Sequence, residues 1–167
     1  MRTLALFLLA VALVTASASA ASPRAKVLVR VTSVGGVLAD ARGHTVYSYA
    51  ADKGRTPACY GACASLWPPF LTSTSPIAGI GAKAKLLGTT KRKDGKLQVT
   101  YAGHPLYFYS GDTKAAQLNG QGYQRSWWAL AASGAKVKKT ATTSTYPPPP
   151  TTPTTTPGYG APGNGGY

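Results

Sequence analysis

The sequence contains no glutamate, and its four acidic residues are Asp40, Asp52, Asp94 and Asp112. It has only two histidines, and neither lies in a Gly-x-Ser-x-Gly or comparable context. An enzyme that acts through a nucleophile needs a base beside it and a third group that orients the base. Because no such set is visible, we expect no enzyme activity and name no catalytic residue.

Residues that bind metals are equally scarce. A zinc site uses three or four protein ligands, whereas the chain offers two histidines, two cysteines and no glutamate. The only methionine is Met1, which excludes a thioether ligand for copper in the folded domain. There is no Cys-x-x-Cys pair and no cysteine followed by histidine. We therefore expect no metal site and no cofactor.

The sequence also lacks an apolar run long enough to cross a bilayer. The longest run, Leu4–Val14, is about half the length that a transmembrane helix needs. It follows Arg2 and leads to small residues ending at Ala20, which predicts a signal peptide over residues 1–20. No cysteine stands directly after Ala20, so no lipobox anchor is expected. We predict a secreted, extracellular protein associated with the cell envelope.

Charge is absent from the C-terminal segment 140–167, which is rich in Thr, Pro and Gly. Such a segment has little to bury, so we predict a disordered tail, extended around Pro147–Pro150. An O-glycosylated stalk and an unmodified solvated tail both fit this composition. Residues 21–139 remain, enough for one small domain.

Lysine and arginine are plentiful: there are 18, and the net charge is +14. A strongly basic protein usually meets polyanions. The basic residues are scattered without the interleaved aromatic side chains that stack bases, so no nucleic acid partner is expected. For an exported chain, an anionic cell-wall polymer or glycan is the expected partner. The alternative, in which the charge only keeps the protein soluble, stays open.

A repeat becomes visible when the chain is aligned with itself at a shift of sixty residues. Without a gap, it pairs Gly35 with Gly95, Val37 with Leu97, Gly43 with Gly103, His44 with His104, Tyr47 with Tyr107, Tyr49 with Tyr109, Asp52 with Asp112, and Trp67 with Trp127. The domain therefore holds two copies of one unit, at about 26–75 and 84–135.

Each copy carries the signals of β-structure. Segments 26–31 and 85–92 read as first strands, 37–40 and 97–101 as second strands, and the tyrosine segments as third strands. We predict a mainly β fold of two tandem antiparallel β-meander repeats, packed with pseudo-twofold symmetry because one unit alone buries too little surface. Helices should be short.

The stretches "TVYSYAAD", "CYGACASLWPPF" and "YAGHPLYFYSGD" resemble a family of secreted bacterial repeat proteins, often lipoproteins. That family is described by a Tyr-x-(Phe/Trp/Tyr)-x-x-Asp motif, which both copies match, at Tyr47, Tyr49 and Asp52 and at Tyr107, Tyr109 and Asp112. The resemblance covers residues 30–133. It implies no assigned function, and this chain lacks the lipobox cysteine common in the family.

The two cysteines, Cys59 and Cys63, predict a disulfide in an exported protein. Two residues four positions apart in a tight turn can meet the Cα spacing that a disulfide requires. A redox-active dithiol and a metal site are the alternatives. The second copy has no cysteine, so a function that needs thiols would belong to the first copy alone.

His44 and His104 follow the turn glycines at equivalent positions. They could act as metal ligands, or as acid–base groups with Asp52 and Asp112. The alternative is a turn histidine that recurs because the unit was duplicated.

The motif aspartates and tryptophans also allow two interpretations. Asp52 and Asp112 favour turn closure through backbone N–H groups, with binding of a ligand donor as the alternative. Trp67 and Trp127 are expected mostly in the core, and an exposed aromatic groove would instead suit a glycan.

Two hypotheses for function follow. The first is a secreted, envelope-associated binding or structural module that binds acidic wall polymers. The second is an extracytoplasmic redox or metal-handling protein that uses Cys59, Cys63 and the histidine and aspartate positions.

Overall fold

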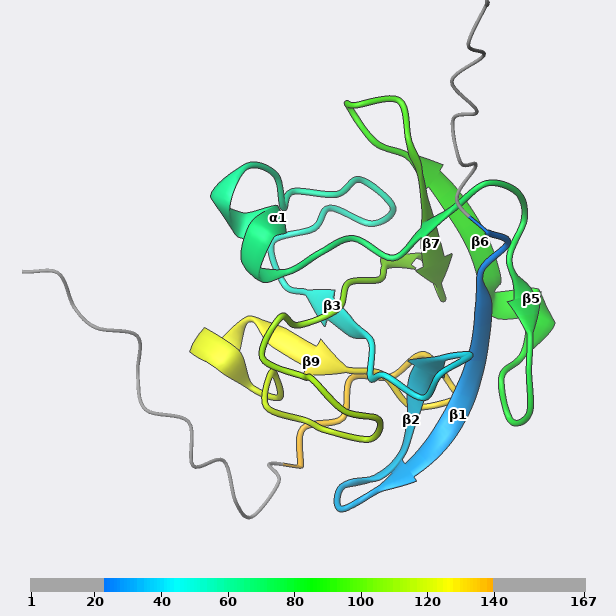
Figure 1. Ribbon diagram of the computed structural model, residues 1–167, viewed down its shortest axis with the longest axis vertical. Coiled ribbons are helices and arrows are strands. Elements are labelled where there is room, and N and C mark those ends of the chain that lie inside the picture. The colour runs from blue at the N-terminus through cyan, green and yellow to red at the C-terminus, as the bar shows by residue number, and fades with distance from the viewer. Residues whose placement is uncertain (1–22, 140–167) are drawn as a thin grey trace, which may run out of the picture.

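The computed structural model describes residues 23–139, so the predicted signal peptide and the predicted tail lie outside the described residues. Within this part of the chain, nine short strands are joined by loops and short helices (Figure 1). The strands are β1 (Lys26–Thr32), β2 (Gly35–Asp40), β3 (Tyr47–Tyr49), β4 (Leu71–Thr72), β5 (Ile77–Ala78), β6 (Leu87–Lys91), β7 (Leu97–Tyr101), β8 (His104–Pro105) and β9 (Trp127–Ala129). The helices are α1 (Ala62–Leu66) and the 3-10 helices η1 (Ala84–Leu86) and η2 (Tyr123–Arg125). The predicted mainly β fold with short helices is confirmed.

The first repeat opens with the hairpin β1–β2, in which Thr32 lies opposite Gly35. Gly35 has φ of 107°, a conformation that side chains with a β-carbon rarely adopt. Further along the chain, β5 returns to the outer edge of β1 and pairs with it in parallel. The sheet order is therefore β2-β1-β5.

The second repeat forms the predicted meander, β6-β7-β8, and β4 from the first repeat pairs with β7. Its first strand is shorter than predicted. Residues 85 and 86 belong to η1, where the Leu86 N–H bonds to the Lys83 carbonyl at 3.0 Å. The prediction of a strand from residue 85 is wrong at this point, because a local turn replaces the ladder.

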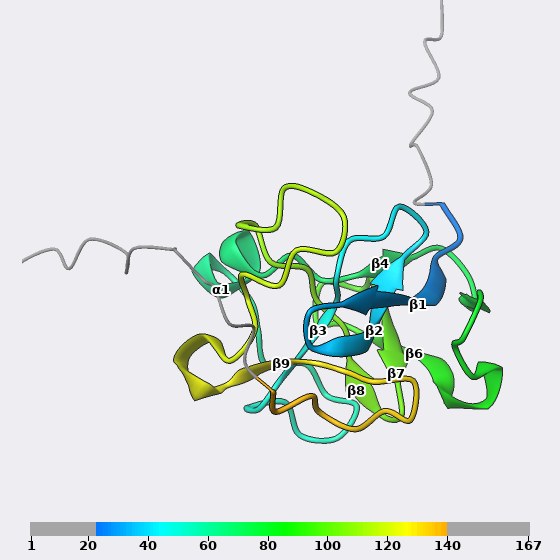
Figure 2. The same ribbon diagram turned by 90° about the horizontal axis from the view of Figure 1, so that it is seen from below.

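The third strands exchange partners between the repeats. β3 of the first repeat pairs with β9 of the second, and the two lie side by side in Figures 1 and 2. In the same manner, Tyr107 of the second repeat is bridged to Pro69 of the first. Tyr47 and Tyr107 face each other and exchange backbone hydrogen bonds of 2.8 and 2.9 Å. Equivalent third-strand residues of the two repeats thus contact the opposite repeat, and the predicted pseudo-twofold packing of the whole domain stays a prediction.

The hydrogen bonds of the second strands show that the gapless alignment of the two repeats is off by one residue in these strands. Leu38 donates its N–H to the carbonyl of Leu130, and Val99 donates its N–H to the carbonyl of Phe70. Phe70 and Leu130 are sixty residues apart, but Leu38 and Val99 are sixty-one apart. The predicted equivalence of Val37 with Leu97 is therefore wrong by one residue.

The reason lies in the turns on either side of these strands. The first hairpin closes over two residues, between Thr32 and Gly35. The second closes over three, with the Arg92 N–H bonded to the Lys96 carbonyl at 2.9 Å. The turn before β8 is one residue shorter than the equivalent turn of the first repeat, which compensates for the extra residue. Because one insertion and one deletion cancel, the shift returns to sixty at the tyrosine strands.

The hydrophobic core consists of two clusters, one centred on aromatic rings and one on aliphatic side chains. The aromatic cluster is formed by both repeats and contains Val34, Val37, Tyr47, Cys59, Trp67, Tyr107, Tyr109, Leu118, Trp127 and Ala129. It lies where β3 and β9 meet, so the motif residues of both copies meet in one place.

Candidate functional site

The tyrosine and aspartate of the repeated motif pair across the two repeats. Tyr47 donates its hydroxyl to Oδ2 of Asp112 at 2.5 Å. Tyr107 donates its hydroxyl to Oδ1 of Asp52 at 3.2 Å. Each motif thus supplies the phenol for one pair and the carboxylate for the other, and the two hydrogen bonds join the repeats side chain to side chain.

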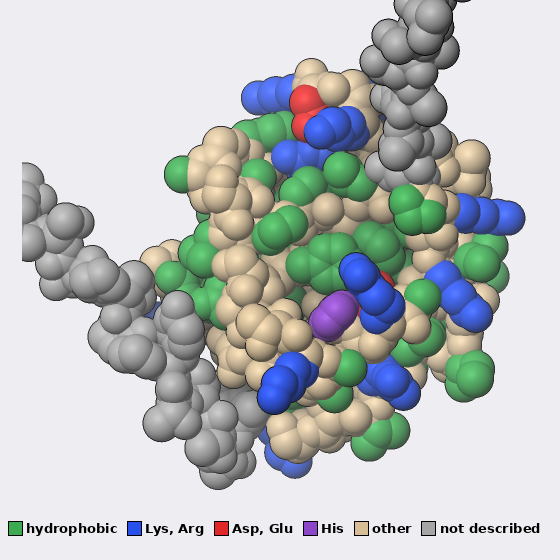
Figure 3. All heavy atoms as spheres, in the orientation of Figure 1, with side chains coloured by type: hydrophobic (Ala, Val, Ile, Leu, Met, Phe, Trp, Pro, Cys, Tyr) green, Lys and Arg blue, Asp and Glu red, His purple; other side chains and the backbone are tan. Residues whose placement is uncertain are grey.

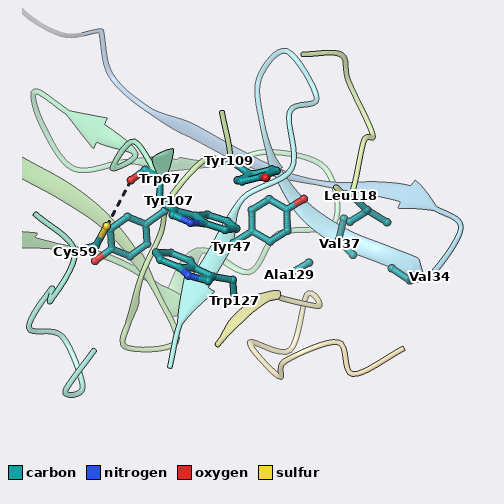
Figure 4. Packing of buried hydrophobic residues seen from close by; sticks show 10 residues of the cluster. All are labelled: Val34, Val37, Tyr47, Cys59, Trp67, Tyr107, Tyr109, Leu118, Trp127 and Ala129. Carbon is teal, nitrogen blue, oxygen red and sulfur yellow. Dashed lines mark hydrogen bonds between the residues drawn. The ribbon is translucent and has the colours of Figure 1, made fainter. Parts of the chain in front are cut away.

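Four aromatic rings form a column, and successive rings come alternately from the first and the second repeat: Tyr49, Trp127, Trp67 and Tyr109. The two indoles lie at its centre, with ring centroids 3.8 Å apart and planes 2° apart, as Figure 4 shows. Tyr49 stacks on Trp127 at 4.1 Å, and Tyr109 lies 4.5 Å from Trp67. Stacked rings at these separations add packing energy beyond the area that they bury.

The paired tyrosines pack against this column with their edges. Tyr47 meets Trp67 at a centroid distance of 5.5 Å, and Tyr107 meets Trp127 at 5.3 Å, both nearly perpendicular. Trp67 and Trp127 are 2% and 3% exposed. The core interpretation therefore describes them, and neither indole offers an open face to a ligand.

Both motif aspartates also close a long loop with their remaining contacts. Oδ1 of Asp52 accepts the Ala58 N–H at 2.8 Å, and Oδ1 of Asp112 accepts the Asn119 N–H at 2.9 Å. The predicted role in accepting backbone N–H groups is observed, but over six or seven residues rather than within a tight turn. Oδ2 of Asp52 is buried without a hydrogen-bond partner among the described residues.

Burial changes the acidity of both pairs. It raises the pKa of Asp52 to about 6, although the Ala58 N–H and the Tyr107 hydroxyl act in the opposite direction. It also raises the pKa of Asp112, against hydrogen bonds from Tyr47 and Asn119. The pKa values of Tyr47 and Tyr107 rise as well, first through burial and then through the adjacent carboxylates. The fold therefore favours the protonated form of all four groups.

Asp52→Asn should change how stability depends on acidity. Between pH about 4 and 6, the folded wild-type chain keeps a proton on Asp52 that the unfolded chain has lost, so this group's contribution to stability falls as pH rises. Asparagine does not titrate and removes that contribution. We expect the variant's free energy of unfolding, measured by urea denaturation from pH 3.5 to 7, to fall less over this window.

His104, whose pKa is lowered by burial and by Lys136, contributes with the opposite sign. It is unchanged in the Asp52→Asn variant, and so is Asp112, so the difference between the two curves isolates Asp52. Parallel curves would mean that Asp52 has an ordinary pKa.

The two histidines occupy different surroundings. His44 donates its backbone N–H to Asp40 at 2.8 Å, and its ring lines a small pocket with Asp112. His104 opens β8, is half-buried and lies near Lys136. The His44 ring lies 3.6 Å from Asp40 Oδ2, and it shares a pocket with Asp112, the motif aspartate of the other repeat, rather than with Asp52. Among residues 23–139, no group of three His, Cys, Asp or Glu side chains is placed to hold a metal ion.

Cys59 and Cys63 form a disulfide, as predicted, with Cα atoms 5.3 Å apart. Cys59 Sγ lies 3.9 Å from the Trp67 carbonyl oxygen, the dashed line in Figure 4. Because a disulfide sulfur carries no proton, we treat this as a packing contact. The bridge holds the loop before Trp67 against the aromatic column.

A buried arginine secures the same loop from the second repeat. Arg92 is 4% exposed, donates Nη1 to Gln98 Oε1 at 2.6 Å, and donates Nη2 to the Cys59 carbonyl at 2.8 Å. Its guanidinium also lies 4.3 Å from the centre of the Tyr60 ring. Arg92 could not be recognised as a buried residue from the sequence, because nothing in its local sequence distinguishes it from the exposed lysines beside it.

A groove of about 450 Å³ lies beside the His44 pocket. Its lining combines cationic and apolar side chains, and it shares Arg42 and Phe108 with the His44 pocket. The groove is lined by Pro23, Arg24, Ala25, Lys26, Asp40, Ala41, Arg42, Phe70, Leu71 and Phe108. These residues come from four separate segments, so no sequence spacing could have grouped them.

A family described as a secreted repeat of unknown function matches the chain twice, at residues 29–70 and 88–131. The two matches together span more than half of the sequence. The chain belongs to this family. Both matches lie inside the repeats predicted from sequence, and the resemblance stated on the motif residues is confirmed. Searches of curated proteins and of solved structures give no match.

Membership in the family gives a secreted repeat protein without an assigned activity. In the described part of the chain, no helix has the length and apolar character needed to span a bilayer. In these two repeats, the tyrosines and aspartates of the repeated motif build the crossed pairs, and Tyr49 and Tyr109 form the central column together with Trp67 and Trp127. The accessible chemistry lies beside it, at His44, Asp112 and the groove.

Proposed function

We propose that this secreted repeat protein is a cell-envelope-associated binding module without catalytic activity, and that its partner is an anionic cell-wall polymer or glycan. The observation that carries the proposal is the groove whose lining contains three cationic side chains, Arg24, Lys26 and Arg42, beside apolar ones. Its one acidic side chain, Asp40, is 6% exposed and pairs with Arg42 at 3.4 Å. A polymer with acidic groups on sugar rings presents negative charge and apolar ring faces together, and this lining matches both.

The placement of the acidic side chains supports this proposal. Asp40 is 6% exposed and accepts backbone N–H groups, while Asp52 and Asp112 are half-buried in the crossed pairs. Asp94 alone among the four is exposed. The surface therefore carries many cations and little negative charge, and Figure 3 shows one such face, with basic side chains around a hydrophobic patch and a histidine.

The floor of the groove supports a glycan rather than a simple counter-ion. Phe70 and Phe108 lie in contact, with ring centroids 4.8 Å apart, and Phe108 is only half-buried. An apolar ring surface contributes to binding through burial, which does not weaken with salt, whereas exposed cations are screened over about 10 Å at 0.1 M ionic strength. The groove thus combines a salt-sensitive and a salt-insensitive contribution.

Removing the three groove cations tests the proposal. We expect the triple variant Arg24→Gln, Lys26→Gln, Arg42→Gln to bind purified cell walls about tenfold more weakly at low salt, because three exposed ion contacts of up to about 1 kcal/mol each are lost. Binding is measured by sedimentation with cell walls, and then with a glycerol-phosphate polymer and a uronic-acid polymer as defined probes.

A matched control removes the same charge elsewhere. Lys96→Gln, Lys138→Gln, Lys139→Gln changes three exposed lysines that do not line the groove. We expect this variant to bind within about twofold of wild type. Equal losses in both triple variants would mean that net charge alone drives binding, and no sedimentation of wild type at low ionic strength would remove the proposal.

The redox or metal-handling alternative gains no support from the geometry. Its two cysteines are joined in a disulfide beside the core, and its two histidines lie in different surroundings. It stays a prediction, which thiol titration of the native protein together with metal analysis would test.

A further inference from the structure

The two repeats differ in whether a further strand covers the outer edge of their first strand. β1 is covered on its outer side by β5, which pairs with it in parallel. β6 is the equivalent strand of the second repeat, and it ends the sheet order β4-β7-β6 with no strand on its outer side among the described residues. The chain after β9 does not supply the missing strand, because its Val137 N–H returns to the Ala129 carbonyl.

The outer edge of β6 has backbone groups in the positions that β5 uses on β1. In the ladder with β7, the backbone groups of residues 86 and 92 each form a hydrogen bond toward the β7 side. Alternation in an antiparallel pair therefore turns the C=O of Leu87 and the N–H and C=O of Thr89 away from β7, while the Leu87 N–H already donates to the Ala84 carbonyl at the end of η1. On β1, the equivalent groups are occupied by β5 and the residues that follow it: Val27 accepts from Gly79 at 2.6 Å, and Val29 donates to Ile80 at 2.9 Å.

Cations surround this open edge. Arg55 donates Nη2 to the outward carbonyl of Thr89 at 2.8 Å, which caps one acceptor and leaves the Thr89 N–H facing outward. A pocket of about 270 Å³ lies along the strand, and it is lined by both Arg55 and Lys85. No acidic side chain lines it. An extended segment that pairs here would meet positive charge on one side and a sheet edge on the other.

We propose that the outer edge of β6 is a docking site for an extended acidic peptide segment of another protein, which adds to the sheet in parallel. The segment's N–H bonds to the Leu87 carbonyl, its C=O accepts the Thr89 N–H, and its carboxylates lie at Arg55 and Lys85. The charge around the edge selects acidic side chains, and the β1–β5 pairing supplies the register. Main-chain pairing of this kind gives affinity, and side-chain pockets give specificity.

The test uses the peptide acetyl-Asp-Ile-Ala-Gly-Ile-Asp-amide, which places the Ile77–Ile80 sequence between two aspartates, and the same peptide with two asparagines. Binding to the mature chain is followed by NMR chemical shifts and by amide hydrogen exchange. We expect shifts on β6, slower exchange at the Thr89 N–H, and weaker binding of the neutral peptide by about tenfold.

Two variants at one position separate main-chain pairing from side-chain effects. Thr89→Pro removes the outward N–H and leaves the β6–β7 ladder intact, since proline is tolerated on an edge with its nitrogen toward solvent. We expect it to weaken binding about tenfold or more, while Thr89→Val keeps the N–H and binds within about twofold of wild type. Arg55→Gln should lose the preference for the acidic peptide, which gives a second test if the proline variant is unstable.

Several results would overturn the proposal. Equal binding of the acidic and neutral peptides, or shifts confined to other strands, would remove it. Protection of the Thr89 N–H in the free monomer would assign the edge to this chain's own tail. Protection that grows with protein concentration would assign it to a second copy.

Discussion

Trp67→Ala should lower the free energy of unfolding by about 3–5 kcal/mol, the range for removing a large aromatic side chain from a core. Trp67 is 2% exposed, and its ring meets Tyr47, Tyr109, Tyr123 and Trp127. A small domain has about 5–15 kcal/mol in total, so the variant should be only marginally stable. The measurement is urea denaturation followed by far-UV circular dichroism, with the midpoint and slope compared to wild type.

Trp128→Ala is the matched control. Trp128 follows Trp127 directly on β9, but it is half-buried on the opposite face and outside the aromatic column. We expect a loss of about 1 kcal/mol or less. Near-UV circular dichroism adds a second readout, because the stacked indole pair should dominate that signal and should disappear only in Trp67→Ala. Similar losses in both variants would contradict the central role of the column.

Arg92→Met should be the second largest change, with a loss of about 2–4 kcal/mol. Methionine keeps most of the apolar stem but leaves the Gln98 side-chain oxygen and the Cys59 carbonyl without donors. Each buried polar group left unpaired costs about 1–3 kcal/mol. Arg92→Lys should lie between wild type and Arg92→Met, because one ammonium cannot reproduce the two-armed contact. Urea denaturation at neutral pH measures these differences.

The position at which the fold loosens distinguishes the role of Arg92 in holding this loop from a general loss of stability. Arg92 holds the loop that contains Cys59, so its removal should loosen this loop and speed trypsin cleavage at the exposed Lys53 and Arg55 while β6 and β7 stay folded. Lys91→Met, at the exposed neighbouring position, serves as the control and should leave both stability and cleavage nearly unchanged. Cleavage at Lys53 and Arg55 that equals wild type would show that the disulfide alone secures the loop.

The asymmetry between the repeats explains why Arg92 could not be predicted. Its equivalent in the first repeat is Thr32, and the equivalent of Gln98 is Val37, once the one-residue shift in the second strand is included. The first repeat therefore has Thr32 and Val37 where the second has the buried Arg92–Gln98 hydrogen bond. A gapless alignment places Gln98 opposite Leu38 and hides this exchange.

Local signals were sufficient for much of the fold. Valine-rich alternation and turn glycines gave strands and hairpins near their observed positions, and the cysteine spacing gave the disulfide. The groove was beyond such reasoning, since Arg24, Arg42, Phe70 and Phe108 are adjacent only after four segments have packed together.

The sequence by itself determined that the chain has two copies of one β-rich unit, that their aromatic motif belongs to the core, and that basic residues dominate the surface. Only the tertiary structure decided that each tyrosine pairs with the aspartate of the other repeat. The physical reason is that both copies carry the same local signals, so pairing within a repeat and pairing between repeats look alike in sequence. The choice depends on which strand edges meet, and β3 meets β9.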